Sequence, residues 1–251
     1  MADNLVSIII PLYNSEKFIK DTINSVLFQT YTNWEVIIVD DCSTDNSVEI
    51  ILKIIDNNSN IRLIKLENNV GSAQSRNTAL ELANGRFITF LDSDDIWHSD
   101  KLEKQVAFML KRKVPISFTS YELIDENGAS KNHIIHSVEK LTQIDYLKNT
   151  IIGFSTSMID TQIVGNSFRM MDIRTRQDTG LWITLLGKGF LAYGLDKVLV
   201  RYRIHSNSIS ANKIKAAMQV WNLYFNIHRL GFFKSAYCFA FYLYNAIKKR
   251  I

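Results

Sequence analysis

The chain has 251 residues, of which 47% are hydrophobic and 22% are charged, and its formal net charge is +4. This composition is typical of a packed globular protein, and it excludes a collagen-like repeat, a disulfide-rich scaffold and a disordered tail protein. The two cysteines, Cys42 and Cys238, lie far apart in the chain, which favours a reducing compartment.

Residues 6–91 alternate between strand-like and helix-like patterns. β-branched runs predict strands at residues 6–10, 34–39, 61–66 and 87–91, with a helix between each pair. The expected helix caps and inner faces are Ser15 with Ile19, Ile23, Val26 and Leu27, then Ser43 or Asp45 with Val48, Ile51, Leu52 and Ile55, and a third helix at residues 71–83. Strands separated by helices predict right-handed crossovers and an α/β fold with a mainly parallel sheet.

The pattern is less regular after residue 100. Apolar runs predict strands at residues 116–124 and 151–159, which fit antiparallel additions to the sheet. Residues 177–186 have helical spacing, with an expected inner side of Leu181, Trp182, Leu185 and Leu186. We find no low-complexity linker or repeat, so a second unit is expected to begin only near residue 212.

Polar residues cluster directly after three of the predicted strands. These clusters are residues 11–14, residues 40–41 and residues 92–95. In mainly parallel sheets, ligands bind beyond the carboxyl ends of the strands, close to the point where the strand order reverses. The three polar turns are therefore expected to form one site at a single edge of the sheet.

The most acidic of these turns contains Asp92, Ser93 and Asp94. Two carboxylates this close repel each other unless a cation or hydrogen bonds offset the repulsion, and Mg²⁺ or Mn²⁺ binds such carboxylates together with phosphate oxygens. A solvated loop in which Asp94 or Asp95 caps the next helix explains the triplet equally simply. Arg76 offers a fork of donors for phosphate or a base, and its alternative is a surface ion pair.

Four motifs in order make the sequence recognisable. They are Ser-Ile-Ile-Ile-Pro-Leu-Tyr-Asn (7–14), Ile-Ile-Val-Asp-Asp-Cys-Ser-Thr-Asp (37–45), Asn-Val-Gly-Ser-Ala-Gln-Ser-Arg-Asn (69–77) and Phe-Leu-Asp-Ser-Asp-Asp (90–95). Over residues 5 to about 210 the chain closely resembles family 2 glycosyltransferases of the GT-A fold type, and within them bacterial enzymes for O-antigen, capsule or teichuronic acid.

The resemblance implies a Rossmann-like GT-A domain at residues 1–212, with a nucleotide-binding half at 1–100 and an acceptor and catalytic half at 101–212. It also implies a bound nucleotide sugar and a Mn²⁺ or Mg²⁺ ion. The nucleotide-sugar residues it implies are Pro11, Tyr13, Asp40, Arg76, Asp92, Ser93, Asp94 and Arg203, and the metal ligands are Asp94 and His205. Without the resemblance, His205 reads as a solvated loop residue.

The resemblance assigns the general base to Asp178. This carboxylate would take the proton from an acceptor hydroxyl as that oxygen attacks the anomeric carbon, which gives inversion. The resemblance also implies acceptor contacts for Gln177 and Trp182; Gln177 stands where the family often has glutamate, and that difference affects the contacts implied for Gln177 but not the base. The alternative for Asp178 is a helix cap.

Residues 213–251 combine many aromatic residues with seven Lys and Arg, and residues 197–251 contain no acid. Basic and aromatic residues in an apolar helix favour the headgroup region of an anionic membrane. The alternative is a helical hairpin packed on the catalytic domain or on a second copy of the chain, and nucleic-acid binding is disfavoured. The chain shows no signal peptide or segment of about 18 apolar residues, so we expect a cytoplasmic enzyme peripheral to the inner membrane face.

The sequence thus predicts an inverting, metal-dependent transferase that moves a sugar from a UDP-sugar to a hydroxyl of a lipid-linked oligosaccharide. A sugar nucleotidyltransferase is disfavoured because residues 11–14 lack the expected Gly-rich loop with arginine. A non-catalytic binder of nucleotide sugars is disfavoured by the presence of Asp178. A response-regulator receiver is disfavoured because it is about half this length.

Overall fold

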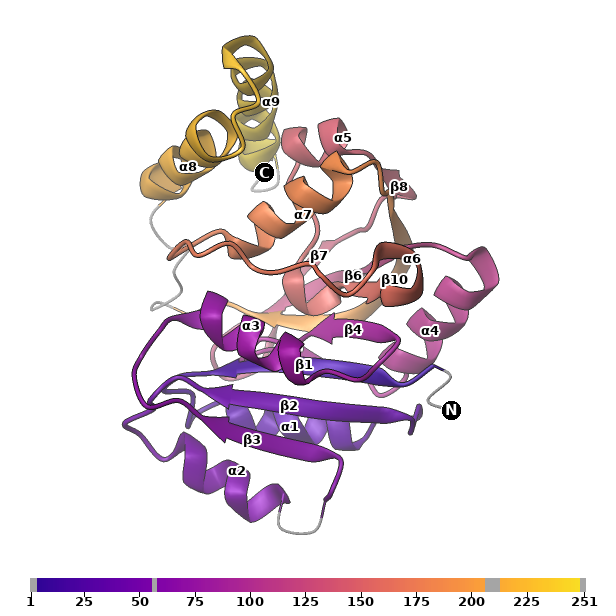
Figure 1. The fold of residues 1–251 in the computed structure, drawn as a ribbon, viewed down its shortest axis with the longest axis vertical. Helices are drawn as coiled ribbons and strands as arrows, with labels where there is room; N and C mark the ends of the chain where they lie inside the picture. The colour runs from indigo at the N-terminus through magenta and orange to yellow at the C-terminus, as the bar shows by residue number, and fades with distance from the viewer. Residues whose placement is uncertain (1–3, 56–57, 206–212, 249–251) are drawn as a thin grey trace.

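The structure is a computed structural model that describes residues 4–55, 58–205 and 213–248 (Figure 1). Its described strands form one mixed sheet in the order β3-β2-β1-β4-β9-β6-β10-β5, with β7 beside β6 and β8 beside β10. The strands are β1 (Val6–Leu12), β2 (Trp34–Asp40), β3 (Ile61–Lys65), β4 (Phe87–Phe90), β5 (Ile96–Trp97), β6 (Ile116–Ile124), β7 (Ser130–Ile135), β8 (Lys140–Leu141), β9 (Met158–Asp160) and β10 (Ala192–Arg203).

Helices cover both faces of this sheet (Figure 1). They are α1 (Ile19–Leu27), α2 (Ser47–Ile55), α3 (Ser72–Leu82), α4 (Lys101–Arg112), α5 (Gln143–Lys148), α6 (Thr161–Val164), α7 (Gln177–Gly187), α8 (Lys213–Asn222) and α9 (Phe232–Lys248), with a 3₁₀ turn η1 (Phe154–Thr156) and a π-helical turn η2 (Leu223–Ile227). This arrangement confirms the predicted α/β, GT-A-like fold class.

Alternation along the central strands creates two cores, one on each side of the sheet. Ile8 and Ile10 of β1 pack in the core under α1, α2 and α4, whereas Ile9 packs in the core that includes residues of α3 and α7. Strands β1, β2, β3 and β4 pair in parallel, and β9 is antiparallel to both β4 and β6. Burial on both faces explains why these strands read as nearly continuous apolar runs.

Three local expectations are wrong. Residues 151–157 form a loop and η1, and only Met158–Asp160 is a strand, because Thr156 and Ser157 donate side-chain hydrogen bonds to nearby carbonyls that compete with a ladder. Leu52 is 46% exposed and lies outside the inner face of α2. Ser15 makes no side-chain cap on α1 because its hydroxyl is bonded to Ser93.

The C-terminal helices pack on the body of the protein and share its core. Val220, Leu223, Tyr224 and Cys238 are buried in the same cluster as residues of α5 and α7. The Tyr224 hydroxyl donates a hydrogen bond of 2.6 Å to the backbone carbonyl of Leu147 in α5. Of the helices in the described ranges, none has the length and apolarity needed to cross a bilayer.

Candidate active site

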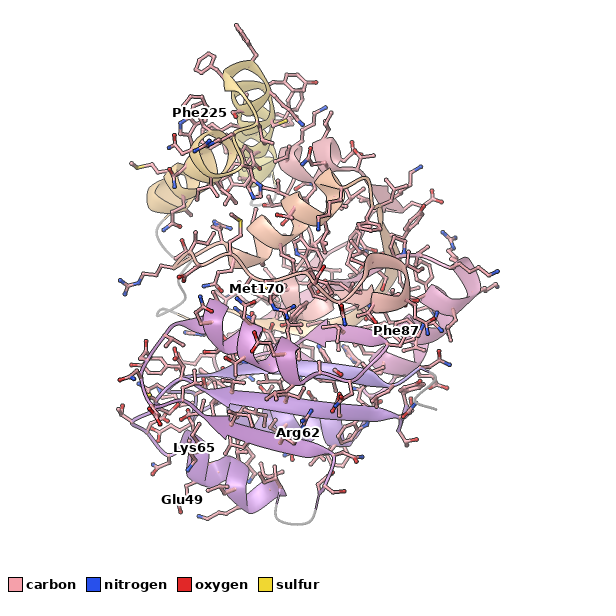
Figure 2. All side chains as sticks on the ribbon, viewed as in Figure 1. Glu49, Arg62, Lys65, Phe87, Met170 and Phe225 are labelled. Carbon is pink, nitrogen blue, oxygen red and sulfur yellow. The ribbon has the colours of Figure 1, made fainter. Side chains whose placement is uncertain are left out.

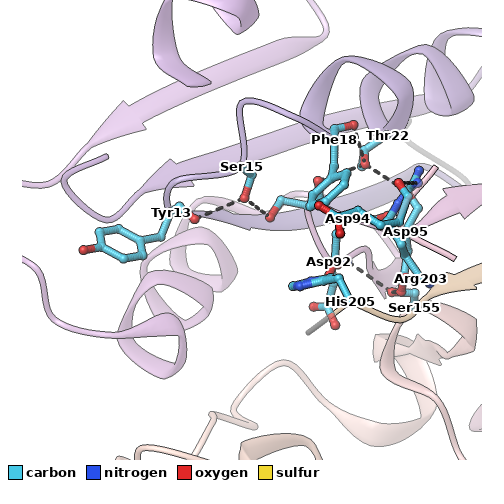
Figure 3. Close-up of polar contacts among 12 residues, drawn as sticks. Tyr13, Ser15, Phe18, Thr22, Asp92, Asp94, Asp95, Ser155, Arg203 and His205 are labelled. Atoms are coloured by element: carbon cyan, nitrogen blue, oxygen red, sulfur yellow. Dashed lines mark hydrogen bonds and ion pairs between the residues drawn. The ribbon is translucent and has the colours of Figure 1, made fainter. Parts of the chain in front are cut away.

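The polar turns that follow β1, β2 and β4 meet at one edge of the sheet, as predicted. The Ser15 and Ser93 hydroxyls lie 2.7 Å apart, which joins the first turn to the third (Figure 3). The backbone N–H of Asp41 donates to the carbonyl of Leu12 at 2.8 Å, which joins the first turn to the second. Parallel strands bring their carboxyl ends to the same edge, so residues far apart in the chain form one site.

The second turn holds two buried carboxylates with different surroundings. Asp40 is 4% exposed and accepts the backbone N–H of Ser43 at 3.2 Å. Asp41 accepts the N–H groups of Val70 and Gly71 at 2.7 and 2.8 Å. Asp41 therefore orders the loop before α3, where Gly71 has a φ of +86° that favours glycine.

The side chain of Arg76 bridges the two halves of the domain. Its Nη2 donates to Asp92 at 2.6 Å, its Nη1 donates to Gln177 Oε1 at 2.9 Å, and its guanidinium lies 4.8 Å from the centre of the Phe154 ring. Arg76 is 8% exposed, so its guanidinium in the ion pair with Asp92 has little contact with water. The start of α7 is consequently held beside the Asp92 turn.

Both side chains expected at the acceptor site are buried, and their contacts with an acceptor stay a prediction. Gln177 is 6% exposed and accepts hydrogen bonds from Arg76 and Ser72, so its amide positions Arg76. Trp182 is fully buried in the core, with its ring edge against Phe154. The structure confirms the other prediction for Trp182, which helical spacing places on the inner face of α7.

The third turn brings an acid and a histidine together. His205 Nε2 lies 3.0 Å from Asp94 Oδ2, although 111 residues separate them in the chain (Figure 3). Burial raises the pKa of Asp94 above its ordinary value, the negative charge of Asp92 raises it further, and His205 opposes the rise. A cation bound at Asp94 would offset the cost of burying this carboxylate beside Asp92.

The donor set at this turn fits a divalent metal ion. A carboxylate and an imidazole both suit Mn²⁺, and Mg²⁺ accepts one or two carboxylates. No group of three or more His, Cys, Asp or Glu side chains arranged to hold a metal occurs within the described ranges. A metal at Asp94 and His205 would therefore need oxygen ligands from elsewhere, which a diphosphate and water can supply.

Arg203 is buried where the Asp94 turn meets the end of β10. Its Nε and Nη1 donate to the backbone carbonyls of Asp94 and Glu126 at 2.8 and 2.7 Å, and its side chain is 2% exposed. Its guanidinium lies 4.8 Å from the centre of the Phe18 ring and fixes the Asp94 turn against the end of β10. A contact of Arg203 with phosphate stays a prediction.

Asp95 and Ser155 complete this junction; Asp95 lies in a predicted polar turn but had no predicted binding role, and Ser155 was not predicted at the site. Asp95 Oδ1 accepts the backbone N–H of Arg203 at 2.9 Å, and Oδ2 accepts the Ser155 hydroxyl at 2.5 Å. Ser155 Oγ also accepts the N–H of Asp92 at 3.1 Å. The adjacency of Asp95 to Asp94 was a usable signal, whereas nothing local marks Ser155 or Phe18.

The remaining predicted residues lie around this edge. Tyr13 is 51% exposed, and its ring is free to stack on a base. Pro11 pairs with Val39 where β1 runs beside β2. Asp178 is half-buried in the first turn of α7, and no side-chain cap bond is formed at that helix start. The cap alternative for Asp178 is therefore not realised.

Comparison with known proteins gives a consistent set of relatives. The model of the family described as "Glycosyl transferase family 2" matches residues 7–173. The chain is 50% identical to "Putative teichuronic acid biosynthesis glycosyltransferase TuaG" of Bacillus subtilis, over 98% of each chain. It is 40% identical to "UDP-Glc:alpha-D-GlcNAc-diphosphoundecaprenol beta-1,3-glucosyltransferase WfgD" of Escherichia coli, over 89% of this chain and 86% of that one.

Solved structures share the fold at lower identity. S. aureus TarS in complex with UDP-GlcNAc aligns with a TM-score of 0.68 and 22% identity, over 89% of this chain and 67% of that chain. The mannosyltransferase PcManGT from Pyrobaculum calidifontis, in complex with GDP-Man and Mn²⁺, aligns with a TM-score of 0.70 and 18% identity, over 90% of this chain and 65% of that chain. Identities this low support the fold alone.

Proposed function

The chain belongs to glycosyl transferase family 2 and is a glycosyltransferase of the bacterial surface-polysaccharide type, and we propose that it transfers a sugar from a UDP-sugar to a hydroxyl of a lipid-linked oligosaccharide with inversion. The observation that carries this proposal is the pairing of Asp94 with His205 beside the Arg76–Asp92 ion pair. The relative WfgD is named as a glucosyltransferase with UDP-Glc as donor and a GlcNAc-diphosphoundecaprenol acceptor, and this similarity supports the proposed donor and acceptor classes.

The donor binds across the carboxyl ends of β1, β2 and β4. Tyr13 stacks on the base, and the buried Asp40 accepts a hydrogen bond from the nucleoside, with Pro11 beside it. Arg76 and Asp92 define the inner wall of the site through their 2.6 Å ion pair. Ser93, which is bonded to Ser15, lies next to the diphosphate.

Asp94 and His205 would hold Mn²⁺ or Mg²⁺, which when bound stabilises the negative charge of the departing nucleoside diphosphate. Asp178 accepts the proton of the acceptor hydroxyl as that oxygen attacks the anomeric carbon from the side opposite the leaving group. Gln177 orients the start of α7 through its hydrogen bond to Arg76. One base with one in-line displacement inverts the anomeric configuration.

Two substitutions and one control test this proposal. Asp178→Asn retains UDP binding but lowers the transfer rate by about two orders of magnitude, the scale expected for a lost general base. Asp94→Ala abolishes the Mn²⁺-dependent part of UDP-sugar binding, measured by titration calorimetry. Asp172→Asn is the matched control, because Asp172 is exposed in the loop before α7, and its activity is unchanged.

The outcomes separate this function from its competitors. Nuclear magnetic resonance of the product reports whether the anomeric configuration is inverted. Near-normal transfer by Asp178→Asn would move the base to another residue. Donor binding by the wild-type chain with no transfer to any lipid-linked acceptor would favour a non-catalytic binder. A lipid-linked acceptor also requires the enzyme to reach the membrane, and we place the transfer at the inner face of the cytoplasmic membrane.

A further inference from the structure

The last helix of the described chain, α9, carries apolar side chains on its exposed side as well as on its buried side. Ser235 and Cys238 of α9 are fully buried against the body of the protein. On the other side of the helix, Phe233, Tyr237 and Tyr244 are 87%, 53% and 63% exposed. Their spacing of four and then seven residues keeps them on one helical face. A helix that is apolar on both sides requires a second partner for its outer side.

The outer side extends onto the neighbouring helix. Figure 2 shows side chains standing out from the hairpin formed by α8, η2 and α9, with Phe225 labelled on it. A hollow of about 730 Å³ lies between these helices and is lined mainly by apolar side chains, including Met218, Trp221 and Leu243. Met218 is 68% exposed, so this surface is open.

Positive charge surrounds the aromatic face, and residues 197–251 contain no acidic residue. Lys148 Nζ lies 4.8 Å from the ring centre of Tyr237 and 5.2 Å from that of Phe241. Arg229 is exposed at the turn between the helices. Asp145 of α5 accepts hydrogen bonds from Thr142 in a capping box, and the charge of Lys148 also helps to lower the pKa of Asp145.

We propose that this face docks on an anionic lipid bilayer. We define the docking face by the exposed side chains of Phe232, Phe233, Tyr237, Phe241, Tyr244 and Ile247. Aromatic rings are stable at the depth of the lipid headgroups, and basic side chains nearby are attracted to anionic lipids. The inference rests on the proposed function in one respect, since a lipid-linked acceptor explains why the enzyme would be held at a bilayer.

A second copy of the chain fits this face less well than a bilayer does. The hairpin carries basic residues and no acid, so two copies packed through this face would bring like charges together. An anionic bilayer offers the opposite charge and an apolar layer at once. The packed-hairpin and membrane interpretations are also compatible, because the inner side of α9 meets the protein and its outer side is exposed.

Vesicle flotation of the full chain tests the proposal without any turnover. The protein floats with vesicles of phosphatidylcholine and phosphatidylglycerol and remains unbound with phosphatidylcholine alone or at high salt. The double variant Phe233→Ser and Tyr244→Ser lowers the floated fraction by about tenfold, because two exposed apolar anchors are lost. Phe28→Ser is the matched control, since Phe28 is 73% exposed at the end of α1.

Failure of the full chain to float with anionic vesicles, or unchanged flotation of the double variant, would overturn the proposal. Light scattering that shows a dimer dissociated by the same two substitutions would also overturn it, in favour of a second copy. UDP-sugar binding by the double variant equals that of the wild type. A lost lipid interaction is thereby distinguished from a failure of the proposed transfer activity, which the Asp94 and Asp178 variants report.

Discussion

Asp95 joins three segments of the candidate active site, and its replacement tests whether that junction supports the Asp94–His205 pair. Its two carboxylate oxygens accept the backbone N–H of Arg203 and the hydroxyl of Ser155. Asp95 is 1% exposed, so water does not replace either acceptor easily. In Asp95→Ala, both donors lose these acceptors inside the protein.

The expected loss of stability in Asp95→Ala follows from these two hydrogen bonds. A buried donor left without a partner costs about 1–3 kcal/mol, so Asp95→Ala should lower the free energy of unfolding by about 2–6 kcal/mol. Asp95→Asn keeps an acceptor for the Arg203 N–H and can donate to Ser155, so it should lose less than half as much. Asp100→Ala is the control: Asp100 forms a partly exposed ion pair with Lys104, worth less than about 1 kcal/mol.

Urea unfolding followed by circular dichroism measures the three free energies, and Mn²⁺ titration of UDP-sugar binding measures the effect on the site. We expect Asp95→Ala to weaken the apparent Mn²⁺ affinity more than Asp95→Asn does, because the end of β10 no longer holds His205 against Asp94. A loss of less than about 1 kcal/mol in Asp95→Ala would refute the hydrogen-bond reasoning. Unchanged Mn²⁺ affinity in a destabilised variant would refute the positioning role.

Three further predictions follow from other contacts. Gln177→Ala removes the acceptor of Arg76 and should lower kcat by about tenfold with a smaller change in KM, while Gln177→Glu restores the rate; equal losses in both variants would contradict this. Burial lowers the pKa of Lys101 well below its ordinary value, so the folded chain binds fewer protons than the unfolded chain. Its unfolding free energy should therefore rise with pH from the folded pKa towards about 10.4, and urea unfolding of Lys101→Met should lack that rise. Gly85→Ala places a Cβ 2.6 Å from the backbone nitrogen of Ser7, so it should lower the free energy of unfolding by about 2 kcal/mol in the same assay. A change near zero would contradict the predicted clash.

The first half of the domain is predictable because its determinants are local. The β-branched runs of β1 and β2 predict buried strands, and the helical spacing of Ile19, Ile23 and Val26 predicts the inner face of α1. The parallel-sheet rule then places the polar turns at one edge without any knowledge of distances. Leu52 was misplaced because apolar spacing alone does not define how far the inner face of α2 extends.

The second half resists the same reasoning because its contacts join residues far apart in the chain. Strand β10 pairs with β6 in parallel, with register shifts between residues 195 and 200, and a periodicity rule has no signal for such shifts. The sequence suggested Asp94 through the acidic triplet but His205 only through family resemblance, and the pairing of β10 with β5 and β6 is what brings them together. The backbone-carbonyl partners of Arg203 could not be predicted, because an arginine beside a predicted phosphate site has the same local sequence whether its partner is an anion or a carbonyl.

The side chain of Gln177 connects α3 to the segment that precedes α7. Its amide oxygen accepts from Arg76 and Ser72, and its amide nitrogen donates to the carbonyl of Ile173 at 2.9 Å. A glutamate at this position would strengthen the contact with Arg76 but would have no N–H to donate to the Ile173 carbonyl. The neutral amide of glutamine can therefore make both hydrogen bonds at this buried position. Because Arg76 is also paired with Asp92, we expect a shift of α7 that moves Asp178 to disturb the Arg76–Asp92 ion pair.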